Sequence, residues 1–351
     1  MENNSKVSII VGCYNVGKWL RMGRLNDIYN QTYINWELIL VDDGSTDETP
    51  ALLDAEAKKD SRIRVLHKEN GGLGSARNAG MDIATGDYIW SFDVDDRVEP
   101  TCIEYCVKTA ESNDYEVVMF GFYVITPSLG TQEVVRLSET IIQSNIELCD
   151  NYLDKILFVP NGNGFFWNKF YKRSFLLKYN IRFENQRIQQ DEVFNLMVYK
   201  HLDRCYISSE LFYHYYIYDK GNNRSKFLAN RFDIYKSVRY HFEDLKNFWH
   251  LKDQRLDDYL NKRFYQSVMV CLLFNITHPQ CTFTKHQVRT EINIIMDDPL
   301  TKESFEYARK NIHGIEQRLY RKACQHRSLL QIRILTDLFL FLRKLHNRLK
   351  R

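Results

Sequence analysis

The sequence lacks the features that mark membrane-spanning and exported proteins. No apolar run approaches the roughly 18 residues that a membrane-spanning helix needs, and the opening residues MENNSKVSII contain neither a basic segment nor a long apolar core. Internal repeats and low-complexity tracts are also missing. We therefore expect an ordinary globular protein that is not exported.

Cysteine is present but follows no pattern. The eight cysteines are scattered along the chain, with no CxxC pair and no repeated spacing of the kind found in zinc sites or disulfide frameworks. This distribution predicts reduced thiols and a cytoplasmic location.

Net charge is small but unevenly distributed. The 351 residues sum to +3, and 44% of them are hydrophobic, which is enough to bury a full core. Residues 321–351 contain nine Lys or Arg and one acidic residue, Asp337, so this segment carries +8 and the rest of the chain about −5. Positive charge is concentrated at the C-terminal end.

Short apolar runs alternate with helical patterns over residues 1–125. Five runs have the composition of strands: KVSIIVGC, WELILVDD, IRVLHK, DYIWSFDVDD and DYEVVMFGFYVI. Because this alternation is typical of βαβ units, we predict an α/β fold with a mostly parallel sheet flanked by helices. Residues 126–218 are more irregular and are predicted to complete that domain, 1–218. Residues 219–351 are predicted to form a helical region.

Polar residues follow three of the predicted strands. Tyr14 and Asn15 come after the first, Asp42 and Asp43 end the second, and Asp93 to Asp96 follow the fourth. In open α/β sheets the ligand site lies beyond the carboxyl ends of the strands. We therefore expect these side chains to converge in one crevice.

Asp43 and Arg77 lie in two turns that precede helices. In VDDGSTDETPALL, Asp43 at a strand end is suited to accept a hydrogen bond from a nucleobase, although the string also fits a simple capped turn. In NGGLGSARNAG, glycines precede the helix that carries Arg77, but neither the dinucleotide nor the P-loop pattern is present. Arg77 fits a ligand site or a structural ion pair equally well.

Asp93 and Asp95 are the strongest functional signal. Mn²⁺ and Mg²⁺ take hard oxygen ligands, usually one or two carboxylates together with substrate phosphates. Two aspartates that flank one residue at a strand end meet that requirement. The string FDVDDR also resembles the DxDx[TV] motif of haloacid-dehalogenase-type phosphatases, but Arg97 stands at the Thr/Val position and the motif follows the fourth strand, so we discount this reading.

Five strings together resemble the family 2 inverting glycosyltransferases of bacteria, which have the Rossmann-like GT-A fold. They occur in the family's order over residues 5–218 and read VSIIVGCYN, WELILVDDGSTDET, NGGLGSARNAG, GDYIWSFDVDD and WNKFYKRS. The resemblance implies a nucleotide-sugar donor, usually a UDP-sugar, bound mainly by residues 1–125, and an acceptor bound by residues 126–218. It also implies an Mn²⁺ or Mg²⁺ ion and inversion at the anomeric carbon.

The resemblance assigns roles to the polar residues at the strand ends. Tyr14 would pack on the base, Asp43 would hydrogen-bond to it, and Asp95 would ligate the metal directly. Asp93 would lie near the ribose and the metal, and Asp96 would brace the turn. The remaining residues expected to contact the donor are Asn15 and Arg77.

Asp191 is similar to the family's general base. It lies in QQDEVFN, where the family usually has a Glu-Asp pair followed by an aromatic residue, but here Gln190 precedes it. That difference removes a neighbour with a possible role in tuning the base or holding the acceptor. An N-cap of the following helix is the structural alternative for Asp191, and Glu192 is the next candidate for the base.

Acceptor contacts are expected from Trp167, Asn168 and Glu192. Trp167 resembles the tryptophan that the family places beside the acceptor, although a core position is equally compatible with its sequence. His214 is either a third metal ligand, as in some relatives, or a core residue among tyrosines.

The C-terminal segment SLLQIRILTDLFLFLRKLHNRLKR has an apolar stripe at helical spacing and basic residues toward its end. Such a helix is suited to the surface of an anionic membrane, on its cytoplasmic face, or to packing on its own domain or a partner. We predict a transferase of hexosyl or N-acetylhexosaminyl groups, acting on a glycan or lipid-linked glycan in cell-surface polysaccharide or glycoconjugate synthesis. The alternative is a non-catalytic nucleotide-sugar or glycan-binding protein of the same fold; nucleic-acid binding is not expected.

Overall fold

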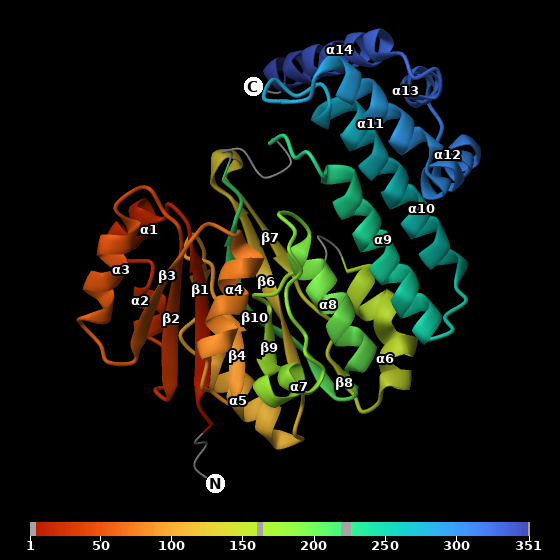
Figure 1. Ribbon diagram of the computed structural model, residues 1–351. Coiled ribbons are helices and arrows are strands. Elements are labelled where there is room, and N and C mark those ends of the chain that lie inside the picture. The colour runs from red at the N-terminus through yellow and green to blue at the C-terminus, as the bar shows by residue number, and fades with distance from the viewer. Residues whose placement is uncertain (1–4, 160–163, 219–225, 350–351) are drawn as a thin grey trace. The chain divides into compact units, whose positions relative to one another are not determined.

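The computed structural model describes three stretches of the chain: residues 5–159, 164–218 and 226–349. The chain divides into two compact units (Figure 1). The first comprises Met1–Asp219 and Asn247–Trp249, and the second comprises Lys220–Lys246 and His250–Arg351. The first unit contains the sheet, and the second is built from helices.

Four parallel strands form one side of the ten-stranded sheet in the first unit (Figure 1). In spatial order they are β3 (Ile63–Lys68), β2 (Trp36–Asp43), β1 (Val7–Cys13) and β4 (Tyr88–Ser91). Val7 of β1 pairs with Trp36 of β2 and with Tyr88 of β4. All eight residues of β2 are buried, as expected for a parallel strand covered on both faces.

The other side of the sheet is mixed. It consists of β9 (Lys169–Lys172), β6 (Val117–Thr126), β10 (Cys205–Tyr216), β5 (Arg97–Val98), β7 (Thr131–Val135) and β8 (Thr140–Ile142). β9 is antiparallel to both β4 and β6, whereas β6 and β10 are parallel to each other. The predicted α/β fold with a mostly parallel sheet is confirmed, with β9 as an antiparallel insertion between the two parallel groups.

Two strand boundaries differ from the prediction. The fourth predicted strand, residues 87–96, ends at Ser91, because the chain turns immediately afterwards and the amide of Asp96 donates to the carbonyl of Asp93 at 2.9 Å. The tyrosine-rich run ELFYHYYIYD, residues 210–219, also has the pattern of a strand, but β10 begins earlier, at Cys205, because its first residues pair with β6 and β8. A turn sets the first boundary and pairing partners set the second, and local composition encodes neither.

Helices flank the sheet. They are α1 (Gly17–Arg21), α2 (Asn26–Tyr29), α3 (Thr49–Ala57), α4 (Leu73–Ile83), α5 (Cys102–Ser112), α6 (Asn145–Tyr152), α7 (Arg173–Lys178) and α8 (Gln190–His201). α4 contacts β1 and β2, and the approach is close, since a Cβ atom added at Gly80 would lie 2.5 Å from Ile10 Cγ2. This packing holds α4 directly against the strands whose ends carry the predicted site.

The second unit is helical, as predicted. Its helices are α9 (Arg231–Phe248), of which the last two residues are counted in the first unit, α10 (Gln254–Met269), α11 (Lys285–Asp297), α12 (Pro299–Asn311), α13 (Ile315–Gln325) and α14 (Leu329–Leu349). α10 continues into a π-helical segment, Val270–Asn275. Thr284 and Gln287 form a capping box at the start of α11, and Asp298 caps α12 through the amides of Leu300 and Thr301.

Among the described residues, no helix combines the length and the apolar character that crossing a membrane requires. All eight cysteines are free thiols, in agreement with the predicted reduced state.

Candidate functional site

The carboxyl ends of β1, β2 and β4 lie at the same edge of the sheet, because these strands are parallel neighbours. Tyr14 and Asn15 follow β1, and the Tyr14 side chain is 51% exposed. Asn15 has a positive φ of 52°, and its side-chain oxygen accepts a hydrogen bond from the amide of Thr46 at 2.8 Å, which ties the two loops together. Because the Tyr14 ring is exposed at this edge, a nucleobase has room to pack on it, which the predicted role requires.

Asp43 is buried at the end of β2 and held by a second loop. Its carboxylate accepts hydrogen bonds from the amides of Gly71 and Gly72, at 2.9 and 2.7 Å, and from Lys68 Nζ at 2.8 Å. Gly72 has a φ of 92°, a conformation that favours glycine and directs its amide toward Asp43. A carboxylate has about four acceptor positions, and these donors fill three of them. Only 2% of Asp43 is exposed, so its contact with a base stays a prediction.

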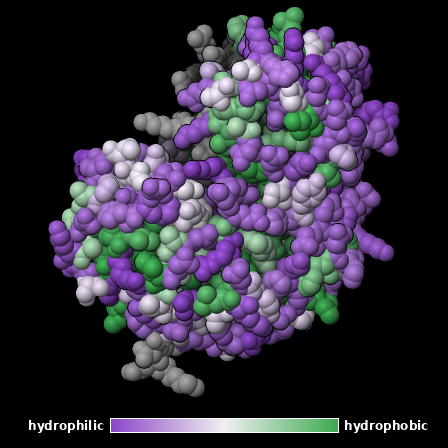
Figure 2. Space-filling model, viewed as in Figure 1, coloured by the Kyte–Doolittle hydropathy of each residue, from purple (hydrophilic) through white to green (hydrophobic). Residues whose placement is uncertain are grey.

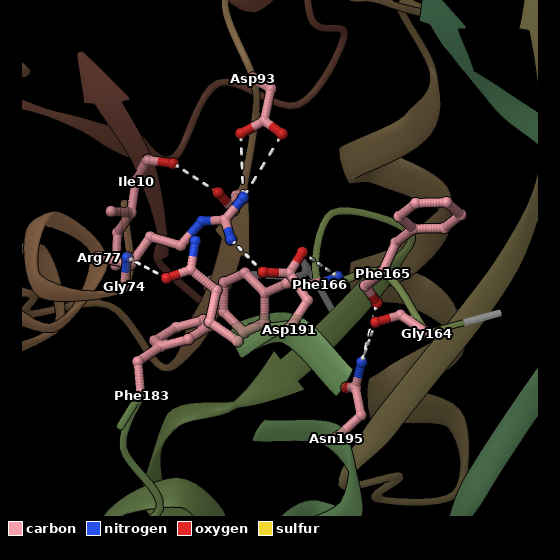
Figure 3. Close-up of polar contacts among 12 residues, drawn as sticks. Ile10, Gly74, Arg77, Asp93, Gly164, Phe165, Phe166, Phe183, Asp191 and Asn195 are labelled. Carbon is pink, nitrogen blue, oxygen red and sulfur yellow. Dashed lines mark hydrogen bonds and ion pairs between the residues drawn. The ribbon is translucent and has the colours of Figure 1, made fainter. Parts of the chain in front are cut away.

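Arg77 joins the two parts of the site (Figure 3). Its guanidinium is fully buried, and Nη2 donates to Asp93 at 3.0 Å while Nη1 donates to Asp191 at 2.6 Å. The rings of Phe166 and Phe183 lie 5.3 and 5.5 Å from its Cζ atom. The structure therefore bears out the ion-pair reading of Arg77. One guanidinium therefore binds both Asp93, a predicted metal ligand, and Asp191, the predicted base.

Asp191 lies in the first turn of α8, with its side chain 21% exposed. One oxygen accepts from Arg77, and the other accepts from the amide of Phe166 at 3.1 Å (Figure 3). The alternative reading of Asp191 as the N-cap is wrong, because Gln189 occupies that position in a left-handed conformation with φ of 57°. Free of a capping role, the carboxylate is positioned by Arg77 and by the Phe166 amide.

Gln190, where the family pattern has a glutamate, points to α4. It is largely buried, and its side-chain oxygen accepts a hydrogen bond from the amide of Gly74 at 2.9 Å. That amide belongs to the first turn of α4 and has no partner within the helix. The change from glutamate to glutamine therefore keeps a link between α8 and α4 without adding a negative charge beside Asp191.

The aspartates after β4 are crowded. Burial and the nearby charge of Asp93 raise the pKa of Asp95 to about 6. Burial also raises the pKa of Asp93, although the adjacent Arg77 opposes this shift. Asp96 is buried, and its carboxylate accepts a hydrogen bond from the amide of Tyr216 at 2.8 Å, which ties the turn to β10. The repulsion among these groups would be relieved by a bound cation.

The residues present fit a divalent cation that also binds substrate phosphates. Asp93 and Asp95 offer hard carboxylate oxygens, and both are incompletely buried. No group of three or more potential metal-ligating side chains occurs within the described stretches. A metal at this place would therefore need oxygen atoms from a ligand to complete its coordination.

His214 does not join these aspartates. Its Nε2 atom lies 2.7 Å from Glu99 Oε1, and its ring stacks on that of Tyr123 with centroids 4.8 Å apart. The structure thus favours the reading of His214 as a satisfied side chain over that of a third metal ligand.

Trp167 and Asn168 lie in the core of the first unit. Trp167 is 2% exposed and stacks on Tyr213 with ring centroids 4.2 Å apart. Asn168 is fully buried and donates to the carbonyl of Phe120 at 3.1 Å. This corrects the expectation that both contact an acceptor, since neither presents surface to one. Glu192, the third residue of that set, is half-buried in the first turn of α8.

Two features of the site were missed by sequence reasoning. The first is Lys169, which is fully buried at the start of β9 and donates to the carbonyl of Phe165 at 2.7 Å and to Asn168 Oδ1 at 2.9 Å. Burial lowers the pKa of Lys169 to about 7, and the charge of Asp191 partly opposes that shift. A lysine between aromatic residues carries no local sign that it will be buried, so only the packing reveals it.

The buried amine predicts a pH-dependent stability. Between pH 7 and about 10.5 the unfolded chain keeps the Lys169 proton while the folded chain has lost it, so stability rises with pH across this window. Across this window, the free energy of unfolding of wild type should rise relative to that of Lys169→Met by up to about 1.4 kcal/mol per pH unit. Urea unfolding at pH 7, 8 and 9 measures this difference. A constant difference between the two proteins would contradict the prediction.

The second missed feature is an aromatic cluster beside Asp95. The Trp19 and Tyr218 rings pack at an angle of 38° with centroids 4.8 Å apart, and the Tyr218 hydroxyl donates to the Asp95 carbonyl at 3.3 Å. The guanidinium of Arg24 lies 5.5 Å from the ring centres of Trp19 and Tyr216, and its charge lowers the pKa of Asp95 against the larger effect of burial. These residues are far apart in sequence, and no motif connects them.

Comparisons with known proteins agree with this architecture. Residues 8–179 match the model of the family described as Glycosyl transferase family 2. The chain is 34% identical over 177 residues to the putative glycosyltransferase EpsH and 32% identical over 212 residues to the uncharacterized glycosyltransferase EpsJ, both of Bacillus subtilis (strain 168). These alignments cover 50% and 60% of this chain, and the chain spans only 50% and 60% of the length of the two relatives. The uncharacterized glycosyltransferase YibD of Escherichia coli (strain K12) is 26% identical over 309 residues, which cover 87% of this chain and 86% of YibD.

Solved structures resemble the whole chain. S. aureus TarS 1–349, in complex with UDP-GlcNAc, aligns with a TM-score of 0.61 and 18% identity over 95% of this chain and 91% of that one. The mannosyltransferase PcManGT from Pyrobaculum calidifontis, in complex with GDP-Man and Mn²⁺, aligns with a TM-score of 0.51 and 15% identity over 95% and 86% of the two chains. At such identities the likeness shows the fold alone.

The sheet order, the flanking helices and these neighbours define a GT-A fold followed by helices. The chain carries a glycosyltransferase family 2 domain over residues 8–179. The resemblance drawn from the five sequence strings is confirmed.

Proposed function

We propose that the protein is an inverting, metal-dependent glycosyltransferase. It moves a hexosyl or N-acetylhexosaminyl group from a UDP-sugar to a hydroxyl of a glycan or lipid-linked oligosaccharide, in cell-surface polysaccharide or glycoconjugate synthesis. The observation that carries the proposal is the bridge Asp93–Arg77–Asp191, which couples a candidate metal carboxylate to a candidate base. The relatives are named as glycosyltransferases, and TarS binds UDP-GlcNAc, which supports this class of donor.

The donor would lie along the carboxyl edge of β1, β2 and β4. Tyr14 would cover the base, Asn15 would shape the loop beside it, and the remaining acceptor position of Asp43 would bind the base. Asp93 and Asp95 would hold Mn²⁺ or Mg²⁺, which when bound supplies positive charge for a departing diphosphate. Arg24, which forms no ion pair among the described residues, adds positive charge near Asp95.

Asp191 would take the proton from the acceptor hydroxyl as that oxygen attacks the anomeric carbon. Its two oxygens are oriented by Arg77 and by the amide of Phe166, and the exposed fifth of the side chain gives an acceptor access to it. A base fixed in this way meets the hydroxyl without reorganisation, which is the main contribution of a positioned side chain. Glu192, the adjacent and likewise half-buried carboxylate, would contact the acceptor.

The competing function is a nucleotide-sugar-binding or glycan-binding protein without turnover. A binding protein has no need for a carboxylate held in place by two separate donors. Asp43, Asp93, Asp95 and Asp191 are all present, and Asp191 is anchored by Arg77 and Phe166. This arrangement favours an enzyme.

A donor screen tests the proposed function. We expect one UDP-sugar to raise the melting temperature of wild type in the presence of Mn²⁺ and to be slowly hydrolysed, while GDP-sugars and dTDP-sugars have smaller effects. Asp95→Ala should lose the Mn²⁺-dependent part of both signals, because the metal carboxylate is gone. Asp150→Ala removes an exposed aspartate of α6, outside the site, and serves as the matched control.

The two contrary outcomes have distinct meanings. If no nucleotide sugar stabilises wild type with or without Mn²⁺, a binding protein for another ligand becomes the better description. If a UDP-sugar stabilises wild type and Asp95→Ala equally, donor binding stands and the metal role of Asp95 is wrong.

The C-terminal helix supports a peripheral membrane contact. One face of α14 is buried, with Ile332 fully covered and Thr336 donating to the carbonyl of Leu273 at 2.9 Å. The opposite stripe is exposed and apolar: Leu330, Ile334, Leu338 and Phe341. Figure 2 shows apolar residues among polar ones on this part of the surface. We infer that the stripe, which lies within the basic segment 321–351, contacts the headgroup region of an anionic, cytoplasmic membrane surface.

Liposome flotation tests this contact. We expect wild type to float with vesicles that contain about one third phosphatidylglycerol and to float much less with purely zwitterionic vesicles. The triple variant Leu330→Ser/Ile334→Ser/Leu338→Ser should lose flotation. The matched control Ile34→Ser/Ile146→Ser/Ile294→Ser removes equally exposed isoleucines elsewhere and should float normally. Equal flotation of both variants would assign α14 to a protein contact. For most basic residues of the predicted membrane segment, from Arg343 onward, the side chains lie outside the described part of the structure.

A further inference from the structure

A cavity of about 470 Å³ opens on the helical unit. Its walls come from α10, α12, α13 and α14 and from the π-helical segment Val270–Asn275. The volume lies within the range of about 300 to 1,000 Å³ that is usual for small-molecule sites. π-Helical turns are rare and occur frequently at functional sites, because they widen a helix locally. Here Val270, Leu273 and Phe274 of that segment all line the cavity.

The cavity has an apolar, aromatic floor. Tyr265, Met269, Leu273 and Tyr320 are buried beneath it. Phe274 and Phe339 line one side, with their ring centroids 5.5 Å apart in an edge-to-face arrangement. Aromatic faces of this kind suit ligands that carry patches of C–H groups.

The rim is polar. Lys262 and Gln266 of α10, His313 of the α12–α13 loop and Glu316 of α13 surround the opening. Within the described parts of the chain, the side chains of Gln266 and His313 take part in no hydrogen bond or ion pair. Other polar groups are already oriented, since the Tyr320 hydroxyl donates to Glu316 at 2.9 Å and that of Tyr265 donates to Gln317 at 3.2 Å.

We propose that this cavity binds a neutral sugar unit of the glycan acceptor, as a site separate from the catalytic residues. A sugar ring offers one apolar C–H face for the aromatic floor and hydroxyls that both donate and accept, as the amide, imidazole and carboxylate groups of the rim require. A strongly anionic ligand fits less well, because the negative charge of Glu316 offsets the positive charge of Lys262. A hydrocarbon chain fits less well, because the rim groups would lose water without gaining partners. The inference rests on the proposed function in taking the acceptor to be a glycan.

Saturation-transfer NMR on the full chain tests the site. The probes are lactose, maltose, cellobiose and N,N′-diacetylchitobiose at millimolar concentration, with farnesol as a hydrocarbon probe. We expect at least one sugar to receive saturation from wild type and from Asp191→Asn. Gln266→Ala/His313→Ala should lower that signal at least fivefold. The control Gln325→Ala/His326→Ala removes the same two residue types at exposed positions of the same unit and should keep it.

The outcomes separate this inference from the proposed function. Absence of a sugar signal, an unchanged signal in Gln266→Ala/His313→Ala, or a signal from farnesol alone would overturn the cavity as a sugar site. UDP titrated into the same samples with Mn²⁺ reports on the donor site. UDP binding that is retained while the sugars fail would leave the glycosyltransferase proposal standing, whereas failure of UDP to bind wild type would count against that proposal independently.

Discussion

Asp191→Asn should reduce the rate of sugar transfer by about 10² to 10⁴-fold while leaving donor affinity nearly unchanged. The asparagine side chain has the same shape and can still accept the hydrogen bond from Arg77, but it does not take up a proton at neutral pH. The loss should therefore appear in kcat, with little change in the Kd for UDP in the presence of Mn²⁺. Transfer to the acceptor identified by the donor screen and calorimetric titration of UDP measure the two quantities.

The neighbouring carboxylate provides the control. Glu192→Gln changes the adjacent residue of the same helical turn and removes the same charge. We expect it to raise the KM for the acceptor while keeping most of kcat. If Asp191→Asn keeps substantial turnover and Glu192→Gln loses it, the base is Glu192 and the anchoring of Asp191 is structural.

Arg77→Met should lower the free energy of unfolding of the sheet-containing unit by about 3 to 5 kcal/mol, the usual cost of leaving buried charges without their partner. The guanidinium is fully buried and binds both Asp93 and Asp191, so its loss leaves two carboxylates in one place without a cation. Arg77→Lys should recover only part of the loss, because one ammonium group does not reach both partners with the fork geometry of arginine. Urea unfolding followed by tryptophan fluorescence measures the effect on this unit, since all five tryptophans belong to it.

A second arginine separates this effect from the general loss of an ion pair. Arg309 pairs with Glu306 on the surface of α12, where both side chains are largely exposed. Arg309→Met should leave the unfolding transition almost unchanged, because solvent screens such pairs. An Arg77→Met protein with wild-type stability would show that the bridge between Asp93 and Asp191 contributes little to the fold. The bridge would then contribute to catalysis only by orienting the two carboxylates.

Much of the donor half was predictable because strands and their ends have local signals. Apolar runs predicted β1, β2 and β3 within one residue at either end. Their parallel arrangement, which follows from the βαβ alternation, placed the polar residues Tyr14, Asp43 and Asp93 at one edge. The acceptor half was less predictable, because its aromatic residues read equally well as core or as ligand contacts. Trp167 belongs to the core only because Tyr213 and Phe165 cover it.

The sequence by itself determined the fold class, the positions of the aspartates and the helical character of the C-terminal region, because hydrophobic periodicity and turn residues act over a few neighbouring positions. The tertiary structure alone decided which charges meet. Arg77 and Asp191 are 114 positions apart, and they pair because Gly80 lets α4 approach β1 closely while Gln190 fastens α8 to the start of α4. It also decided that Lys169 is buried near Asp191 and that the helices of the second unit enclose a cavity. Contacts of this kind depend on how whole elements pack, and no local pattern in the chain encodes them.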